Sequence, residues 1–278
     1  MSSVRKGRQR RAASLLFLRE LRRRRSVILG YHGVAECERR LDLCRLQIAP
    51  GLFRAQLQLL LDAGFQFATM TNAVEPLTRP QPAPGIAVVT FDDGLRNNLT
   101  TAAPILAELG VPATVYVACD LIDGHNPWIG AGGGGEILSA DEVRELSNAG
   151  WEIGSHTLSH ADLASLDYDR CLAEINGSRD LLQQITGATV DTFAYPFGRY
   201  GPAAVRAVRD SGMRAAVTTG SGRWDAFELT RAMISAGDPS PVLALKLMDM
   251  YEPLLHLGPL RAARSASRSA RARLQAAP

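Results

Sequence analysis

Two short stretches of this chain hold residues whose types and spacing suit metal-assisted chemistry. Asp92 and Asp93 directly follow the apolar run 86–91, and His156 and His160 lie four positions apart in a second stretch. Burying an unpaired carboxylate is costly, so two adjacent aspartates at the end of a buried strand need a partner such as a cation. The two imidazoles can supply the rest of that cation's shell.

One aspartate with two histidines is a three-ligand set that leaves positions open for water and substrate. Such a set is typical of a catalytic metal and not of a structural one. We predict one divalent ion as cofactor, with zinc preferred for nitrogen and oxygen ligands, although iron, cobalt or nickel would also fit. Because successive strand residues point in opposite directions, one aspartate can face the ion while its neighbour serves as general base.

The segments around these residues alternate between strand-like and helix-like patterns from residue 27 onward. We expect strands at 27–32, 65–69, 86–91, 113–118, 151–155, 192–195, 215–218 and 229–234. We expect helices at 50–62, 100–109, 139–148, 167–186, 202–211 and 239–257, with loops at 76–85 and 125–135. Repeated strand–helix units predict a parallel sheet, and about seven or eight of them favour a closed or nearly closed barrel.

In a parallel barrel, catalytic groups collect where the strands end. Unusual residues lie at the ends of several expected strands: His32, Asp92, Asp93, His156, the stretch 195–197 and Arg231. Their convergence on one rim predicts a single site built from distant parts of the chain.

At these residues the chain resembles the polysaccharide deacetylases of the NodB-homology group, which are metal-dependent carbohydrate esterases. The resemblance is carried by 90–94, 155–160, 193–198 and 31–33, and it covers roughly residues 26–235. It implies a distorted (β/α)₇ barrel. It also implies removal of an acetyl group from an N-acetylated amino sugar, with release of acetate. The expected substrate is a polysaccharide or oligosaccharide.

The resemblance also assigns roles to individual residues. Asp92 would be the base, and Asp93, His156 and His160 would be the metal ligands. The backbone N–H of Phe197 would help hold the oxyanion beside the metal.

Two departures from the family pattern leave questions open. The family usually has arginine at the position of Ala194, where it orients the base, and Arg231 is our candidate replacement. The later acid-bearing segment is not recognisable, so the general acid is His32, His256 or His125. We prefer His32 because it ends a rim strand, although a structural hydrogen bond is the alternative for it. Two other functions stay open: a sugar-binding barrel with impaired catalysis, and an amidase acting on another non-peptide C–N bond in a small glycosylated molecule.

Charge divides the chain of 278 residues into three parts. Residues 1–25 hold ten basic residues and one acid, and residues 259–278 hold five arginines and no acid. The net charge of +3 therefore combines two basic ends with an acidic body, 26–258, which we assign to the barrel. The ends are expected to be solvated and partly disordered, with a short amphipathic helix near 14–18 that lies on the domain or on a membrane surface. Their charge suits contact with anionic lipid or a polyanion. No nucleic acid is required, and oligomeric state is not predicted.

No apolar stretch reaches the length of a transmembrane helix, and no cleavage site follows the apolar run 14–18. We therefore predict a cytoplasmic protein, with a peripheral membrane location as the alternative. The cysteines Cys37, Cys44, Cys119 and Cys171 form no C-x-x-C pair. Thiols are expected, and a Cys37–Cys44 disulfide is the less favoured alternative.

Overall fold

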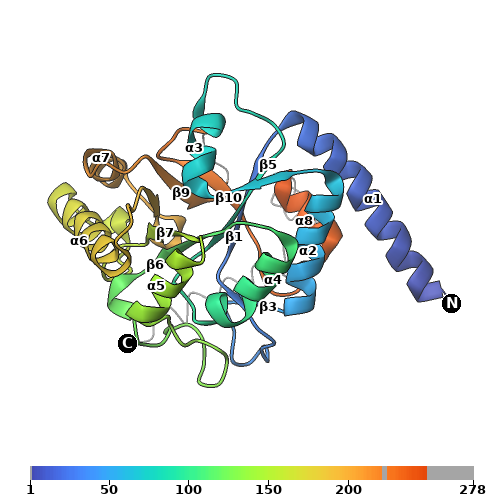
Figure 1. Cartoon of the computed structure of the whole chain (residues 1–278), viewed down its shortest axis with the longest axis horizontal. Helices are drawn as coiled ribbons and strands as arrows, with labels where there is room; N and C mark the ends of the chain where they lie inside the picture. The colour runs from blue at the N-terminus through green and yellow to red at the C-terminus, as the bar shows by residue number, and fades with distance from the viewer. Residues whose placement is uncertain (1, 221–223, 249–278) are drawn as a thin grey trace.

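A ring of parallel strands forms the centre of the molecule (Figure 1). The computed structural model describes residues 2–220 and 224–248. The main sheet has eight strands in the order β1-β10-β9-β8-β7-β6-β5-β4, and each pairing is parallel. These strands are β1 (Val27–Tyr31), β4 (Gln66–Ala68), β5 (Ile86–Phe91), β6 (Thr114–Val117), β7 (Glu152–Ser155), β8 (Thr192–Ala194), β9 (Ala215–Thr219) and β10 (Leu229–Met233). A small second sheet pairs β2 (Gly33–Val34) with β3 (Gln47–Ile48).

The ring closes because β1 pairs with β5 as well as with β10. The other edge of β5 is shared: β4 pairs with residues 86–88, and β6 pairs with residues 90–91. Seven strands therefore form the barrel, and β4 lies outside the ring beside the first half of β5. The expected distorted (β/α)₇ barrel is confirmed.

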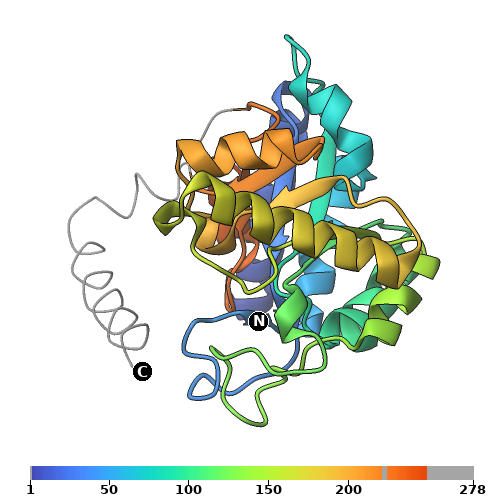
Figure 2. The same ribbon diagram turned by 90° about the vertical axis from the view of Figure 1, so that its left-hand side faces the viewer.

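Helices cover the outside of the ring (Figures 1 and 2). They are α1 (Ser2–Arg24), α2 (Pro50–Ala63), α4 (Ala103–Leu109), α5 (Ala140–Asn148), α6 (Tyr168–Thr186), α7 (Pro202–Asp210) and α8 (Ser240–Leu247). Capping residues set several of their boundaries. The Ser139 hydroxyl and the Glu142 carboxylate form a capping box at the start of α5, and the Asp167 carboxylate accepts from the amide of Arg170 at the start of α6. Gly64 ends α2 in the left-handed conformation that glycine adopts without steric cost.

The basic helix α1 packs along α2 and α8. Leu18 and Leu21 are buried in the main apolar core, whereas Leu16 is 67% exposed. Within the described residues, none of the helices combines the length and apolar character needed to cross a bilayer. Contact of the basic ends with a membrane or a polyanion stays a prediction.

The segment after β4 differs from expectation. Helix α3 (Met70–Thr78) occupies residues of which 76–78 were predicted to be loop. The Thr69 side chain caps its start, and Met70, Ala73 and Leu77 are fully buried on one face. Pro76 lies in the last turn of α3, so it disturbs only the end of the helix. Packing of the buried face against the barrel stabilises the rest.

Smaller differences occur at two other helices. The helix expected from residue 100 begins earlier, as a π-helical turn at Asn98–Ala102 that leads into α4. The last expected helix, 239–257, is observed as α8 up to Leu247. The remainder of that prediction, from 249 onward, lies outside the described residues.

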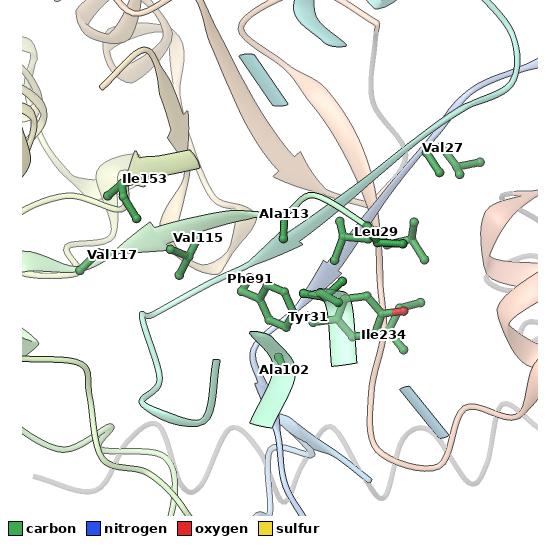
Figure 3. Packing of buried hydrophobic residues seen from close by; sticks show 14 of the residues in the cluster. Val27, Leu29, Tyr31, Phe91, Ala102, Ala113, Val115, Val117, Ile153 and Ile234 are labelled. Atoms are coloured by element: carbon green, nitrogen blue, oxygen red, sulfur yellow. The ribbon is translucent and has the colours of Figure 1, made fainter. Parts of the chain in front are cut away.

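Strand side chains alternate between two apolar cores. Val27, Leu29 and Tyr31 of β1 point toward the helices, and Figure 3 shows Tyr31 beside Phe91 of β5. Residues of the opposite face, such as Ile28, lie in a second cluster with the buried face of α3. Helix α3 therefore closes the interior of the barrel at the end where the strands begin, and the opposite end is left for the site.

Candidate functional site

The predicted residues meet in a cavity of about 240 Å³ at the carboxyl ends of the strands. Its lining includes His32, Asp92, Asp93, His156, His160 and Phe197. They come from the ends of β1, β5, β7 and β8 and from the loops that follow, as the barrel geometry requires. The convergence expected from the sequence is therefore present in the structure.

Asp93, His156 and His160 form one compact, buried group. The Asp93 Oδ1 atom lies 3.3 Å from Nε2 of His160 and 3.6 Å from Nε2 of His156. Ligand atoms of the three side chains all lie within 4.8 Å of one another. One carboxylate oxygen and two imidazole nitrogens at this spacing match the ligand set of a divalent metal with open positions.

The hydrogen bonds around this group show that it fits a cation. The Nδ1 atom of His156 lies 2.8 Å from the carbonyl oxygen of Ala194, so it must donate, and the neutral ring presents its Nε2 lone pair to Asp93. Asn126 Nδ2 donates to the other Asp93 oxygen at 2.7 Å. Lone pairs of His156 and Asp93 thus face each other, an arrangement that a cation between them would stabilise.

Burial sets the charge states of the metal-site residues. It lowers the pKa of His156 from its ordinary value to about 4, which keeps the ring neutral and able to bind a metal. Burial alone would raise the pKa of Asp93. The nearby His160 and His32 rings outweigh that effect and hold the Asp93 pKa well below its usual range.

Asp92 is engaged by a different partner, Arg231 of β10. The guanidinium donates to both carboxylate oxygens, at 2.6 and 2.7 Å, and also to the hydroxyl of Thr90 at 3.0 Å. Val88, Thr90 and Asp92 share the inward face of β5, and this alternation aims the carboxylate into the barrel. Burial raises the pKa of Asp92, but the charge of Arg231 more than offsets it, so the pKa lies below its ordinary value. The replacement expected for the missing arginine at Ala194 makes the predicted contact.

The backbone leaves regular geometry where the ligands are delivered. Positive φ angles occur at Asp93 (71°), Thr157 (69°), His160 (58°) and Phe197 (59°), all in or beside the cavity. Such conformations cost of order 1–3 kcal/mol each for residues other than glycine and persist only when the surroundings enforce them. At the end of β5 the turn at Asp93 separates the two aspartates, so that Asp92 faces Arg231 and Asp93 faces the histidines.

Two aromatic rings form a lip over His160. Their ring centroids lie 4.8 Å (Trp128) and 4.7 Å (Phe197) from that of His160, and 5.6 Å from each other. Phe197 is 42% exposed, which is unusual for so large an apolar side chain. The Gly-rich loop that holds Trp128 is tied down, because the Gly134 carbonyl accepts from Gln47 Nε2 at 2.8 Å. It is thus part of the wall of the site.

The three candidates for the general acid have different positions. His32 lines the cavity and is half-buried, while its backbone carbonyl accepts from Asn98. His125 is not among the lining residues, and its ring lies against the backbone at Gly135. His256 lies outside the described residues. Of the two candidates that the structure describes, His32 is the one that lines the cavity.

Sequence reasoning missed two residues of this site, Asn126 and Arg45. Asn126 holds Asp93 from 33 positions further along the chain, and Arg45 lines the cavity from the loop after β2. Neither residue type is unusual in a loop, so no local pattern marks them. The cysteines agree with expectation: Cys37 and Cys44 are not joined in a disulfide, and Cys119 and Cys171 are buried thiols.

Residues 78–216 match the polysaccharide deacetylase family. Among curated proteins, YxkH of Bacillus subtilis (strain 168) is 28% identical over 196 residues, which are 70% of this chain and 64% of YxkH. A chitin deacetylase of Pestalotiopsis sp is 32% identical over 114 residues, which are 41% of this chain and 34% of that protein. The chain thus spans less than two thirds of the length of these curated relatives.

Solved structures show the same fold. The Streptococcus pyogenes deacetylase PplD in complex with acetate has a TM-score of 0.68 and 25% identity, over 80% of this chain and 97% of that one. The polysaccharide deacetylase BC0361 from Bacillus cereus has a TM-score of 0.66 and 26% identity, over 80% of this chain and 68% of that one.

Proposed function

Because the chain belongs to the polysaccharide deacetylase family, we propose that it is a metal-dependent hydrolase that removes N-acetyl groups from an amino-sugar polysaccharide or oligosaccharide, releasing acetate. The observation that supports this most directly is the pairing of two neighbouring aspartates with different partners. Asp93 faces two imidazoles, and Asp92 faces a buried guanidinium. Such a division of roles suits hydrolysis, which needs both an electrophilic centre and a base.

Asp93, His156 and His160 would hold one divalent ion, most simply zinc, with iron, cobalt or nickel as alternatives that the same donors accept. When bound, the ion would polarise the acetyl carbonyl oxygen and lower the pKa of water. Around it, Asn126 and the Ala194 carbonyl orient Asp93 and His156, so the ligand geometry does not depend on the ion alone.

In this proposal Asp92 is the general base. Arg231 keeps the Asp92 carboxylate ionised at neutral pH and fixes both its oxygens, so that it is able to accept a proton from the attacking water. Thr90 and the Thr218 carbonyl in turn hold the guanidinium in place. Arg231 is thus a positioning residue, which acts through Asp92.

His32 and Phe197 complete the proposed machinery and both line the cavity. His32 would protonate the departing amine, because it is the candidate acid that lines the cavity. The Phe197 backbone N–H, presented by a left-handed residue in the turn that follows β8, would donate to the oxyanion.

The observation that favoured a binding-only barrel was the absence of arginine at position 194. Arg231 brings a guanidinium to Asp92 from β10, and this contact supports a catalytic barrel over a binding-only one. The test below also distinguishes a polymeric substrate from a small glycosylated molecule.

The test is acetate release from a panel of N-acetylated saccharides and small acetamido glycosides, using metal-loaded protein. We expect acetate from at least one saccharide, loss of release after chelation, and recovery when a divalent ion is restored. A protein that binds no stoichiometric divalent metal would contradict the proposal, as would one whose acetate release is unaffected by chelator.

A further inference from the structure

Arg45 is a cation in the wall of the cavity that the proposed reaction does not use. It lines the same cavity as Asp92 and His156 and is half-buried. Across the part of the chain that the structure describes, no carboxylate forms an ion pair with it. This sets it apart from Arg231, whose charge is matched by Asp92.

Asp42, the acid three residues before Arg45 in the same loop, is engaged by the backbone of that loop. The Asp42 carboxylate is buried and accepts from the amides of Leu46 (2.8 Å) and Gln47 (2.7 Å). The Arg45 amide donates to the Asp42 carbonyl, and Arg45 itself has a φ of 60°. Asp42 therefore fixes the backbone of the loop and leaves the guanidinium charge uncompensated.

A second loop, after β10, holds the guanidinium at the cavity. Arg45 Nη2 donates to the Ala236 carbonyl, and the Ala236 amide donates back to the Arg45 carbonyl at 3.2 Å. The next residue is Gly237, with a φ of 81°, where a Cβ atom would lie 2.9 Å from Arg45 Nη2. An arginine side chain has five N–H donors, and the carbonyl of Ala236 occupies one of them.

Charge decides what the remaining donors can bind. The Asp92 charge is balanced by Arg231, and a divalent ion would more than balance Asp93. Arg45 then makes the cavity electropositive, and such a cavity concentrates anions. A planar guanidinium is also suited to bind a carboxylate or phosphate through two parallel hydrogen bonds.

We propose that Arg45 forms an oxyanion subsite, so that the substrate is an N-acetylated saccharide carrying a carboxylate or phosphate on the reacting sugar or on its neighbour. This inference rests on the proposed deacetylase function and narrows its substrate class.

The experiment compares matched substrates and matched variants. The substrates are methyl N-acetylglucosaminide, N-acetylglucosamine 1-phosphate and a disaccharide of glucuronic acid and N-acetylglucosamine, so that neutral, phosphate and carboxylate forms are separated. The variants are Arg45→Gln, Arg45→Lys and Arg39→Gln. The last removes the same charge from an exposed position in the same loop that does not line the cavity. Acetate release gives kcat/KM, and calorimetry on metal-free protein gives Kd without turnover.

We expect the wild-type protein to prefer one of the anionic sugars, and Arg45→Gln to weaken binding of that sugar by about 10- to 100-fold while leaving the neutral sugar unchanged. Arg45→Lys should retain most of the preference, and Arg39→Gln should behave as wild type. Equal binding of charged and neutral sugars, or a preference that survives Arg45→Gln, would overturn the inference. Absence of acetate from every sugar would instead contradict the proposed function, and the calorimetric comparison would still decide the role of Arg45.

Discussion

The two ends of the barrel each hold a carboxylate among polar groups, but the two groups are built differently. At the start of β7, Glu152 accepts from the amide and hydroxyl of Thr71 at 2.7 and 2.9 Å, and from the hydroxyls of Thr114 at 3.1 Å and Thr192 at 2.5 Å. At the opposite end, just after β5, Asp93 accepts from Asn126 on one oxygen, and its other oxygen faces two imidazoles. Donors surround the first carboxylate, whereas lone pairs face the second.

This difference separates a structural carboxylate from a ligand. Glu152 has neutral donors on both oxygens and joins the starts of β6, β7 and β8 to α3 without help from a cation. Within the described part of the chain, the Asp93 oxygen that faces His156 and His160 has no neutral donor of this kind, and an ion or a proton between these groups would supply the missing positive charge. Buried polarity alone therefore does not identify a metal site, and the direction in which each donor points has to be examined.

The largest effect that would test this comparison is on turnover. Asp92→Asn keeps the shape of the side chain but removes its capacity to accept a proton, so we expect acetate release to fall by about 10²- to 10⁴-fold. Metal content, measured on the same preparation, should stay at the wild-type value because the ligands are untouched. Substantial residual turnover, or loss of the metal, would show that Asp92 is not the base.

The next effect is on metal affinity. His160→Ala removes one of the three candidate ligands. Loss of a residue that only hydrogen-bonds to a ligand lowers metal affinity by about 10- to 100-fold, and we expect the loss here to be larger. Competition with a chromophoric chelator measures this change. Glu152→Gln is the matched control at the other end of the barrel, and the metal affinity of this variant should equal that of the wild type. If both variants lost metal equally, the contrast between the two carboxylates would be wrong.

Glu152→Gln should lower the stability of the fold, although it leaves metal affinity unchanged. The Glu152 carboxylate accepts four hydrogen bonds. In Glu152→Gln one carboxylate oxygen becomes an NH₂ group, which cannot accept from the hydroxyl and amide donors around it. We expect the free energy of unfolding to fall by about 1–3 kcal/mol, with turnover per folded molecule unchanged. Urea unfolding followed by circular dichroism measures the loss. A variant as stable as the wild type would mean that the hydrogen bonds from Thr71, Thr114 and Thr192 to Glu152 contribute little to stability.

Prediction from the sequence was most successful where local pattern and burial coincide. The bounds of β5 are those expected, 86–91, because a strand buried on both faces is a continuous apolar run that ends abruptly at Asp92. The candidate ligands were predicted for the same reason, since each follows a strand end. Helix α3 was missed because its stability comes from packing Met70, Ala73 and Leu77 into the base of the barrel, which no local propensity reveals.

Contacts between distant segments explain the other gaps. Arg231 was only a candidate, because its bond to Asp92 spans 139 positions and exists only once β10 has joined β1. Asn126 and Arg45 lie in loops whose paths are set by several strands at once. The chemistry of a residue can be read from the sequence, but its neighbours in such loops cannot.

The smallest effect is a difference in alkylation rate between the thiols near the cavity and the thiols in the core. Burial raises the pKa of Cys119 to about 12, so at pH 8 only about one in 10,000 of these groups is a thiolate. Cys44 lines the cavity and Cys37 is partly exposed. Iodoacetamide at pH 8 should modify Cys37 and Cys44 in the native protein, and Cys119 only after unfolding, as peptide mass spectrometry would show.

A rise to pH 10 should accelerate alkylation of Cys37, whose thiolate fraction still increases strongly in that range. Cys119 should stay unmodified, because this pH remains below its pKa and the group remains enclosed. Native-state alkylation of Cys119 at a rate similar to that of Cys37 would show that the apolar core beside α6 opens in solution.

The closure of the ring by β1, β5 and β10 imposes an order in time on a chain that emerges from the ribosome amino end first. All three candidate metal ligands have been synthesised by residue 160, whereas the guanidinium that pairs with the proposed base arrives at residue 231, on the strand that closes the ring. A nascent chain therefore has every donor of the candidate metal site long before Asp92 has its partner. The last barrel strand to be synthesised is the one that brings this guanidinium to Asp92.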